Sequence, residues 1–254
     1  MAEKKGPVIS VRNIKKAFGG VMAVDRLSFD LFEGEVLGVI GPNGAGKTTV
    51  ANIITGFQKP DSGEVIFRGR KLTGMPPYKI ADLGVTRTFQ VVRPYPSLQA
   101  YKNLIVPLWS PRARRFASSR GGDRDAVAID LLEDVGFERD AFVPYKLASA
   151  LPLGYLKRLE LARCLALRPE VIICDEVFSG LSMSEIASMV PLIDRFRIRG
   201  VTLLMIEHRL RELFRVANRL VVMDFGVKIA EGVPDKVMQD EKVRRAYLGE
   251  EIEL

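Results

Sequence analysis

The chain has 254 residues, 47% of them hydrophobic and 27% charged, so it is long enough to bury the core of one α/β domain with an insertion. No apolar run approaches the roughly 18 residues of a membrane span, and the first residues lack the apolar core of a secretory signal, so we expect a cytoplasmic protein. Cys164 and Cys174 each lie in an apolar stretch, which excludes a disulfide scaffold and a zinc-binding spacing and predicts small core residues.

The N-terminal region has the pattern of antiparallel strands joined by turns that contain glycine. The three predicted strands are Val8 to Val11, Leu27 to Leu31 and Glu64 to Phe67. Three other apolar runs lack the alternation of a half-exposed strand, which is typical of strands buried on both faces of a parallel sheet. These runs are Val36 to Ile40, Val171 to Cys174 and Val201 to Ile206.

The composition changes between about residues 97 and 168, where helical patterns are broken by prolines. The predicted helices are Tyr101 to Leu108, Asp125 to Val135 and Tyr155 to Leu167. Near the C-terminus, Arg219 to Asp224 and Val227 to Ala230 flank Phe225-Gly226 and predict a hairpin.

The formal net charge of +7 is compatible with nucleic acid, an anionic membrane surface or a phosphate-rich ligand, and it does not choose among them. The densest basic run is mixed with Pro, Ser and Gly, so we expect a solvated loop, with contact to lipid headgroups near a membrane partner as the functional alternative. The run comprises Arg112, Arg114, Arg115, Arg120 and Arg124.

The segment from Gly41 to Thr48 fits the pattern G-x-x-x-x-G-K-[ST], follows a predicted buried strand and opens a helix that begins near Lys47. Glycines let backbone N–H groups converge on phosphate oxygens, Lys47 supplies a point charge to the β and γ phosphates, and the Thr48 hydroxyl is a ligand for Mg²⁺. An ordinary Gly-rich turn between a strand and a helix does not explain the pair Lys47-Thr48. The segment therefore predicts nucleotide binding.

Two carboxylates, Asp175 and Glu176, end one of the predicted buried strands. Beside a phosphate loop, Asp175 can reach Mg²⁺ through water and Glu176 can activate the attacking water as a general base. His208 is the only histidine and follows the strand Val201 to Ile206, at the edge where parallel α/β sheets place their active sites. Its imidazole can bind a γ-phosphate or orient Glu176.

Two further residues carry little signal by themselves. Gln90 follows the strand-like stretch Val85 to Phe89 and would pass as a surface glutamine. Phe18 precedes Gly19-Gly20 and is either a core aromatic or a ring that stacks on a base.

Taken in chain order, these motifs resemble those of the ATPase subunits of ABC transporters over essentially the whole chain. The resemblance implies an α/β fold of the P-loop NTPase, ABC type. It implies a single ABC ATPase domain over residues 1–254, with a mixed-sheet, RecA-like core and an N-terminal antiparallel β subdomain. A helical signature subdomain would be inserted at about 97–168, and a C-terminal hairpin and helices would follow at about 219–254.

The same resemblance implies ATP and Mg²⁺ as cofactors and catalytic roles for Gln90, Glu176 and His208. The implied ATP contacts are Phe18, Gly41, Asn43, Gly44, Ala45, Gly46, Lys47, Thr48 and Thr49, the implied Mg²⁺ ligands are Thr48, Gln90 and Asp175, and the implied signature contacts to a partner's ATP are Leu151 and Gly154.

Within the family, several strings are similar to the LivG-type subunits of branched-chain amino acid importers, although urea-importer ATPases and the ATPase of lipopolysaccharide export share parts of them. They are Phe18-Gly19-Gly20 with Ala23-Val24, Arg87-Thr88-Phe89-Gln90, Ile206-Glu207-His208 and the tail Arg245-Ala246-Tyr247-Leu248-Gly249-Glu250. The implied partners are a second ABC ATPase subunit, transmembrane permease subunits and, indirectly, an extracytoplasmic solute-binding protein, with the chain bound peripherally at the inner face of the membrane. No nucleic acid is expected, because ABC ATPases of DNA repair or translation carry coiled-coil insertions or two fused domains, which do not fit in this length.

The chain departs from the family pattern at two places. The signature, usually close to Leu-Ser-Gly-Gly-Gln, is Leu151-Pro152-Leu153-Gly154-Tyr155, and Pro152 supplies neither a hydroxyl nor an N–H. After Glu176, Val177 replaces the usual proline and Ser182 the usual aspartate.

Both departures affect the surface offered to the partner's nucleotide. We therefore hypothesise an asymmetric heterodimer, with a homodimer as the alternative, in which the ATP on this chain's phosphate loop is the one hydrolysed. A nucleotide-binding regulatory subunit with negligible turnover is the competing class.

Overall fold

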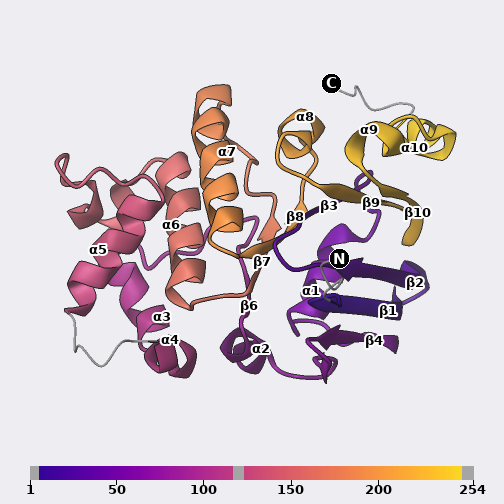
Figure 1. Cartoon of the computed structure of the whole chain (residues 1–254), viewed down its shortest axis with the longest axis horizontal. Coiled ribbons are helices and arrows are strands. Elements are labelled where there is room, and N and C mark those ends of the chain that lie inside the picture. Colours follow the sequence, from indigo (N-terminus) through magenta and orange to yellow (C-terminus); the bar gives the residue numbers. More distant parts are fainter. Residues whose placement is uncertain (1–5, 117–122, 248–254) are drawn as a thin grey trace, which may run out of the picture.

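A computed structural model of the chain describes residues 6–116 and 123–247, and in it two sheets lie side by side with helices around them (Figure 1). The four-stranded antiparallel sheet has the order β2 (Val21–Leu31), β1 (Ile9–Phe18), β4 (Ser62–Phe67) and β5 (Arg70–Lys71). The six-stranded sheet has the order β10 (Val227–Gly232), β9 (Arg219–Asp224), β3 (Val36–Ile40), β8 (Thr202–Ile206), β7 (Val171–Asp175) and β6 (Val85–Arg87).

The six-stranded sheet is mixed. Strands β9, β3, β8, β7 and β6 run parallel, and β10 pairs antiparallel with β9 as the predicted hairpin. The three continuous apolar runs form β3, β7 and β8, and every residue of these strands is buried. Their apolar side chains alternate between two hydrophobic clusters, one on each face, and the polar residues Asp175 and Thr202 occur only at strand ends.

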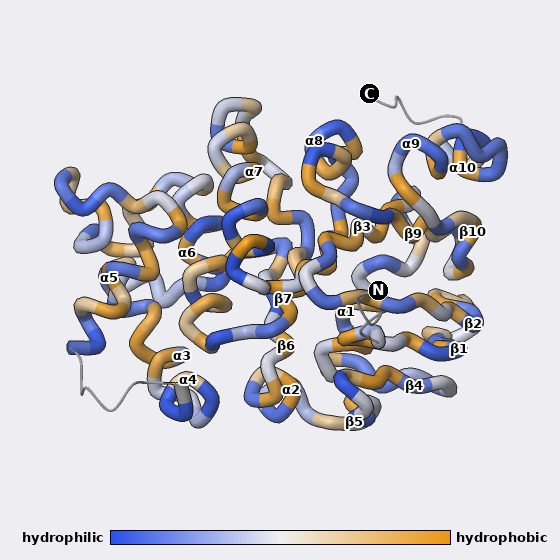
Figure 2. The backbone as a smooth tube through the Cα atoms, viewed as in Figure 1, coloured by the Kyte–Doolittle hydropathy of each residue, from blue (hydrophilic) through white to orange (hydrophobic). Residues whose placement is uncertain are grey.

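Helix α1 (Lys47–Ile54) packs in the hydrophobic cluster that joins the two sheets. The opposite face of the six-stranded sheet packs against α7 (Met183–Ile198) in the second cluster, which continues through α6 (Leu153–Ala166) to α5 (Arg124–Asp134), packed on α6. Figure 2 shows hydrophobic stretches where the strands cross the middle of the molecule and a hydrophilic surface along α10 (Glu241–Ala246).

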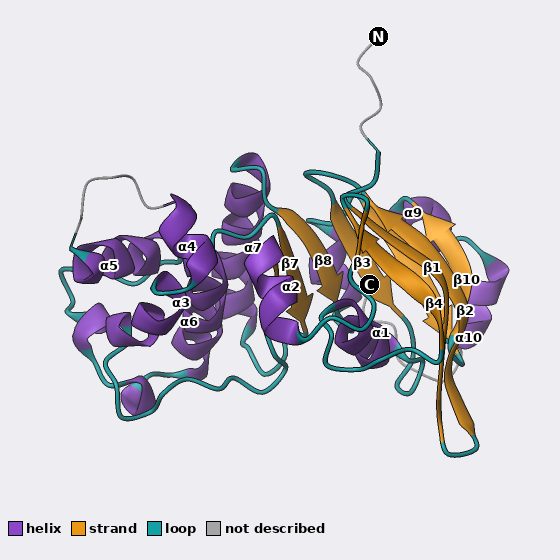
Figure 3. Cartoon of the chain, turned by 90° about the horizontal axis from the view of Figure 1, so that it is seen from below, coloured by secondary structure: helices purple, strands orange, loops and turns teal. Residues whose placement is uncertain are grey.

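The remaining helices are short. They are α2 (Pro77–Leu83), α3 (Ile105–Leu108), α4 (Pro111–Phe116), α8 (Leu210–Phe214), α9 (Pro234–Val237) and the 3₁₀ turns Tyr101–Leu104, Val143–Tyr145 and Ala148–Ala150. Helices α3 to α6 gather on one side of the molecule, away from the antiparallel sheet (Figures 1 and 3). This grouping agrees with an inserted helical subdomain, although the limits of that subdomain stay a prediction.

The expectation of a solvated loop for the basic run is wrong for Arg112. This residue lies on α4, is only 6% exposed, and donates hydrogen bonds to the carbonyl oxygens of Arg168 (2.8 Å) and Leu83 (2.7 Å). Its guanidinium also pairs with Glu170 at 3.3 Å. The planar guanidinium of Arg112 presents several N–H donors at once, and its bonds to the Leu83 and Arg168 carbonyls fix α4 to the core.

Arg114 and Arg115, on the same helix, and Arg124 are exposed to solvent, but all three lie on helices, so a loop was the wrong expectation for them as well. Arg124 begins α5 and its guanidinium lies 3.5 Å from the ring centroid of Trp109, while Arg115 donates to the Asp82 carbonyl at 3.0 Å. Arg120 lies outside the described residues, as do Leu248 to Glu250 of the tail string.

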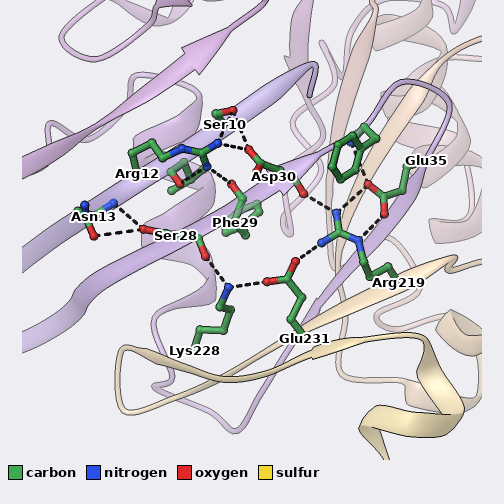
Figure 4. A network of polar contacts seen from close by, with 12 residues as sticks. Ser10, Arg12, Asn13, Ser28, Phe29, Asp30, Glu35, Arg219, Lys228 and Glu231 are labelled. Carbon is green, nitrogen blue, oxygen red and sulfur yellow. Dashed lines mark hydrogen bonds and ion pairs between the residues drawn. The ribbon is translucent and has the colours of Figure 1, made fainter. Parts of the chain in front are cut away.

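A network of polar contacts joins the edge of the antiparallel sheet to the C-terminal hairpin (Figure 4). Arg219 at the start of β9 pairs with Glu35 (2.7 Å) and Glu231 and donates to the Asp30 carbonyl of β2. Lys228 of β10 donates to the Ser28 carbonyl of β2 at 2.7 Å. These contacts fix the C-terminal hairpin of one sheet to the edge strand of the other.

Both cysteines are buried, as predicted, and burial raises the pKa of the Cys164 thiol to about 12. Within residues 6–116 and 123–247, no helix is both long and apolar enough to cross a bilayer.

Candidate nucleotide-binding site

The loop between β3 and α1 requires glycine at two positions. Gly41 has a φ of 152°, and a Cβ there would lie 2.0 Å from the carbonyl oxygen of Met223. Gly46 has a φ of 95°, and a Cβ there would lie 2.2 Å from the carbonyl oxygen of Ala23. Backbone from two other strands therefore presses against the loop, and only a residue without a side chain fits.

Helix α1 begins at Lys47, as predicted, directly after Gly46. Its first turn, Lys47-Thr48-Thr49, contains no acidic residue, so no carboxylate competes from within that turn for the free N–H groups and the positive end of the helix dipole. Lys47 is buried and its Nζ donates to the carbonyls of Gly41 (2.5 Å) and Pro42 (2.9 Å). The ammonium is thus held against the loop that would surround the phosphates.

Asp175 ends β7, which lies two strands from β3 in the sheet, so the two strands are roughly 10 Å apart. The strands run parallel, so the Asp175 carboxylate and the loop after β3 lie at the same edge of the sheet. One oxygen pairs with Arg87 at 2.5 Å, and both side chains are nearly fully buried. The other oxygen, Oδ1, is buried without a hydrogen-bond partner among the residues that the structure describes. A buried acceptor of this kind fits a role toward Mg²⁺.

Glu176, Gln90 and His208 converge at this edge. Gln90 Nε2 donates to Glu176 Oε2 at 2.7 Å, and His208 Nδ1 lies 3.9 Å from the same oxygen. Sheet register explains the meeting: Asp175 pairs with Ile206, so the residues that follow each strand emerge side by side. The structure thus brings together three residues that are far apart in sequence.

Glu176 has a φ of 51°, an uncommon conformation for a residue with a side chain. Such a backbone costs of order 1–3 kcal/mol and persists only where its surroundings enforce it. Here the Glu176 N–H donates to the Ile206 carbonyl at 2.8 Å, and Lys157 donates to the Glu176 carbonyl at 3.0 Å. The turn aims the carboxylate away from the strand and toward Gln90.

Phe18 lies at the end of β1 with 49% of its surface exposed, next to Gly19 in the hairpin turn. The Lys16 ammonium lies 5.5 Å from its ring centroid. This exposure shows that Phe18 is not a core aromatic, and its ring remains accessible for stacking on a base.

The signature segment is arranged differently. Leu151 is buried, and Pro152 is the N-cap of α6, where it offers no side-chain acceptor to the free N–H groups of the first turn. The hydroxyl of Tyr155 donates to Glu138, which raises the pKa of Tyr155 and lowers that of Glu138. Tyr155 is therefore held by its own subdomain.

Gly154, the second residue of α6, lies against a carboxylate. A Cβ at Gly154 would be 2.5 Å from Glu185 Oε1. Glu185 forms a reciprocal capping box with Ser182 at the start of α7, and the Ser182 hydroxyl and N–H, with a smaller contribution from the Gly154 N–H, lower the pKa of Glu185. A negative charge of the chain itself thus stands at the N-terminus of the signature helix.

Sequence reasoning missed Arg87 as a site residue. Its guanidinium donates to Asn52 of α1 and Asp175 of β7, both at 2.5 Å, and so ties the helix after the phosphate loop to the strand that ends in Asp175. Its place in the string Arg87 to Gln90 was the available signal. Lys157 and Glu207 were missed as well. Glu207 lies in the string Ile206-Glu207-His208, whereas no string named above includes Lys157.

The chain matches the family model described as ABC transporter over residues 24–179, more than half of its length, and the model described as branched-chain amino acid ATP-binding cassette transporter over residues 227–253. It belongs to the ABC transporter ATPases. The predicted α/β fold of ABC type is confirmed, and the chain is an ATP-hydrolysing transporter subunit of the branched-chain amino acid type.

Two groups of relatives support this placement. The chain is 38% identical to the high-affinity branched-chain amino acid transport ATP-binding protein LivG of Salmonella typhimurium, over 96% of the chain and 98% of the relative, and 35% identical to BraF of Pseudomonas aeruginosa over the same shares. It is 30% identical to the lipopolysaccharide export ATP-binding protein LptB of Haemophilus influenzae, over 97% and 99%. A nucleotide-free ATP-binding cassette of known structure is 30% identical, with a TM-score of 0.85 over 96% of this chain and all of that one.

Proposed function

We propose that the chain hydrolyses ATP held on its own phosphate loop and thereby powers import of branched-chain or related amino acids. The observation that carries the proposal is the cluster of Gln90, Glu176 and His208 at the sheet edge beside that loop, with Glu176 Oε2 at 2.7 Å from Gln90 and 3.9 Å from His208. A carboxylate flanked by an amide donor and an imidazole is suited to accept a proton from an attacking water.

Each residue of the cluster has a distinct task. Glu176 accepts the proton of the water, Gln90 orients the carboxylate through its amide, and His208 contacts the γ-phosphate. Lys47 and the N–H groups at the start of α1 bind the phosphates, and Phe18 stacks on the adenine. Thr48, Gln90 and Asp175 would hold Mg²⁺, which when bound neutralises charge on the β and γ phosphates.

Amino acids are the proposed cargo because the relatives LivG and BraF, named for branched-chain amino acid transport, are 38% and 35% identical, and the matching C-terminal model carries the same description. The likeness to the lipopolysaccharide export ATPase is weaker, at 30% identity. The urea and lipopolysaccharide alternatives are therefore less supported.

The proposed partners are a second ABC ATPase, permease subunits and, through these, an extracytoplasmic solute-binding protein, with the chain bound at the inner face of the membrane. A groove of about 710 Å³ supports the permease contact. Its lining is mainly apolar and includes Phe57 and Phe89, whose rings meet edge to face at 5.5 Å. Because Phe89 precedes Gln90, a permease segment seated here would act directly on the Gln90 loop.

The heterodimer is supported by the start of the signature helix. Pro152 removes donors there, and the Glu185 carboxylate lies against Gly154. A γ-phosphate brought by a partner would meet a like charge, which weakens its binding. We therefore propose that the ATP completed by this signature is held but turned over slowly.

The test is reconstitution of the chain with its permease subunits and its partner ATPase in proteoliposomes containing ATP. Uptake of labelled leucine, isoleucine and valine is compared with uptake of urea. Leucine uptake that depends on Glu176 supports the proposal. Uptake of urea alone would reassign the cargo, and uptake unaffected by Glu176→Gln would make the chain a regulatory subunit.

A further inference from the structure

Lys157 of α6 is a buried cation that reaches across from the helical region to the catalytic edge of the sheet. Its side chain is 3% exposed, and its Nζ donates to the carbonyl oxygens of Gln90 and Glu176, each at 3.0 Å. These carbonyls belong to the two residues whose side chains also meet at 2.7 Å. One ammonium therefore fixes the backbone of both members of the proposed catalytic pair.

Lys157 lies on the same helix as the signature segment, so movement of that segment reaches the contact with Gln90 and Glu176. It lies four residues, about one turn, after Leu153, the first residue of α6, so it shares a rigid helix with the signature segment. Glu176 directly follows β7 and Gln90 lies three residues after β6, and both strands belong to the six-stranded sheet. A displacement of α6 therefore acts on both carbonyls through a single side chain.

Burial and the neighbouring carboxylates act on Lys157 in opposite directions, and burial is the larger influence. Burial lowers the pKa of Lys157, while Glu207, Glu176, Asp175 and Glu160 act in the opposite direction. Glu207 is fully buried and accepts the Phe178 N–H at 3.1 Å, but its Oε2 has no partner within the described part of the chain. An ammonium near buried carboxylates binds carbonyls more firmly than a neutral donor would.

We propose that Lys157 is a positioning residue, which holds the backbones of Gln90 and Glu176 in the arrangement needed for hydrolysis and transmits movement of the signature helix to the catalytic carboxylate. The inference rests on the proposed roles of Gln90 and Glu176. It means that this chain's signature segment and its own hydrolytic site are linked within one subunit, in addition to any link across a dimer.

The contact is suited to such transmission because it is short and sensitive to geometry. Lengthening both bonds by 1 Å would break them by the usual distance criteria. The φ of 51° at Glu176 then loses one of the contacts that enforce it. A misplacement of about 1 Å at a catalytic group costs about 10²-fold in rate.

The experiment compares four variants of the full chain in the assembled transporter. Lys157→Met keeps the length of the side chain and removes the donors, and Lys157→Gln keeps a neutral donor. Arg158→Met is the matched control, because Arg158 also donates to two carbonyls, those of Val135 and Gly136 at 3.1 Å, outside the catalytic pair. Glu176→Gln is the benchmark for loss of hydrolysis.

We expect Lys157→Met to lower the kcat for ATP about 10- to 100-fold, with the KM and the Kd of a non-hydrolysable ATP analogue changed less than about threefold. Lys157→Gln should recover part of the loss, and Arg158→Met should stay within about twofold of the parent. If Lys157→Met is unstable, the double variant Lys157→Met with Glu207→Gln also replaces the neighbouring buried carboxyl group by an amide, and it should show the same kcat loss.

Two results separate the ideas at stake. A Lys157→Met or double variant that matches Arg158→Met in kcat, or whose loss lies entirely in KM, overturns the positioning role while leaving the proposed function intact. Full turnover by Glu176→Gln would instead overturn the proposed function itself.

Discussion

The phosphate-loop side of the molecule and the signature segment differ in how their polar groups are held. Around Gly41 to Thr48, the central groups are fixed from distant parts of the chain. Arg87 pairs with the Asp175 carboxylate, Gln90 donates to the Glu176 carboxylate, and Lys157 donates to the Glu176 backbone carbonyl. The signature helix instead has Pro152 as its N-cap residue and the Glu185 carboxylate at its start. The difference teaches that one chain can keep its own nucleotide site intact while changing the surface it offers to a partner.

The largest effect should come from Glu176→Gln, which breaks the side we propose as active. Loss of the general base should lower ATPase kcat of the complex about 10²- to 10⁴-fold, with ATP still bound. The control is the equivalent substitution in the partner ATPase, which should cost far less. Equal losses from the two variants would refute the asymmetry.

Arg87→Met tests whether the buried pair holds Asp175 in place. Removing one partner of a buried ion pair leaves an uncompensated carboxylate and should lower the free energy of unfolding by about 3–5 kcal/mol, measured by urea titration. Arg12→Met, which breaks a half-exposed pair with Asp30, is the control and should cost less than about 1 kcal/mol. Similar costs for both would show that the Asp175 pair contributes little.

Glu207 makes stability dependent on pH. Burial raises the pKa of Glu207 from 4.5 to about 8 in the folded chain. Between these values the folded chain holds a proton that the unfolded chain has released, so the free energy of unfolding falls as pH rises, by about 1.4 kcal/mol per unit. Glu207→Gln removes this fall, and the stability of the variant relative to the parent should rise by about 2–3 kcal/mol from pH 6 to pH 8. A constant difference across that range would contradict the raised pKa.

The smallest effect should come from repairing the signature side. In the Glu176→Gln background, the residual turnover arises at the site completed by this chain's signature. Pro152→Ser restores a hydroxyl and an N–H at the helix start and should raise that turnover about two- to tenfold, the usual worth of one or two hydrogen bonds. No increase would mean that Pro152 does not limit the second site.

The strands were predictable because their signal is local. Apolar runs without alternation gave β3, β7 and β8, and the strand before Gly41 and the helix after it followed from the same pattern. The arginine run failed for a physical reason. Its Pro, Ser and Gly residues indicate a loop, but the Arg112 guanidinium finds carbonyls of Leu83 and Arg168 that only the folded chain brings near.

The sequence by itself determined the Gly41 to Thr48 loop and the altered signature, because both are contiguous segments with residue types at fixed spacing, and the family resemblance supplied the proposed roles of Gln90, Glu176 and His208. Only the tertiary structure decided which other side chains contact these residues and fix their positions. Arg87 and Asp175 are 88 residues apart, and Lys157 reaches Gln90 across 67. Contacts at such separation depend on how the layers pack, and no local pattern records them.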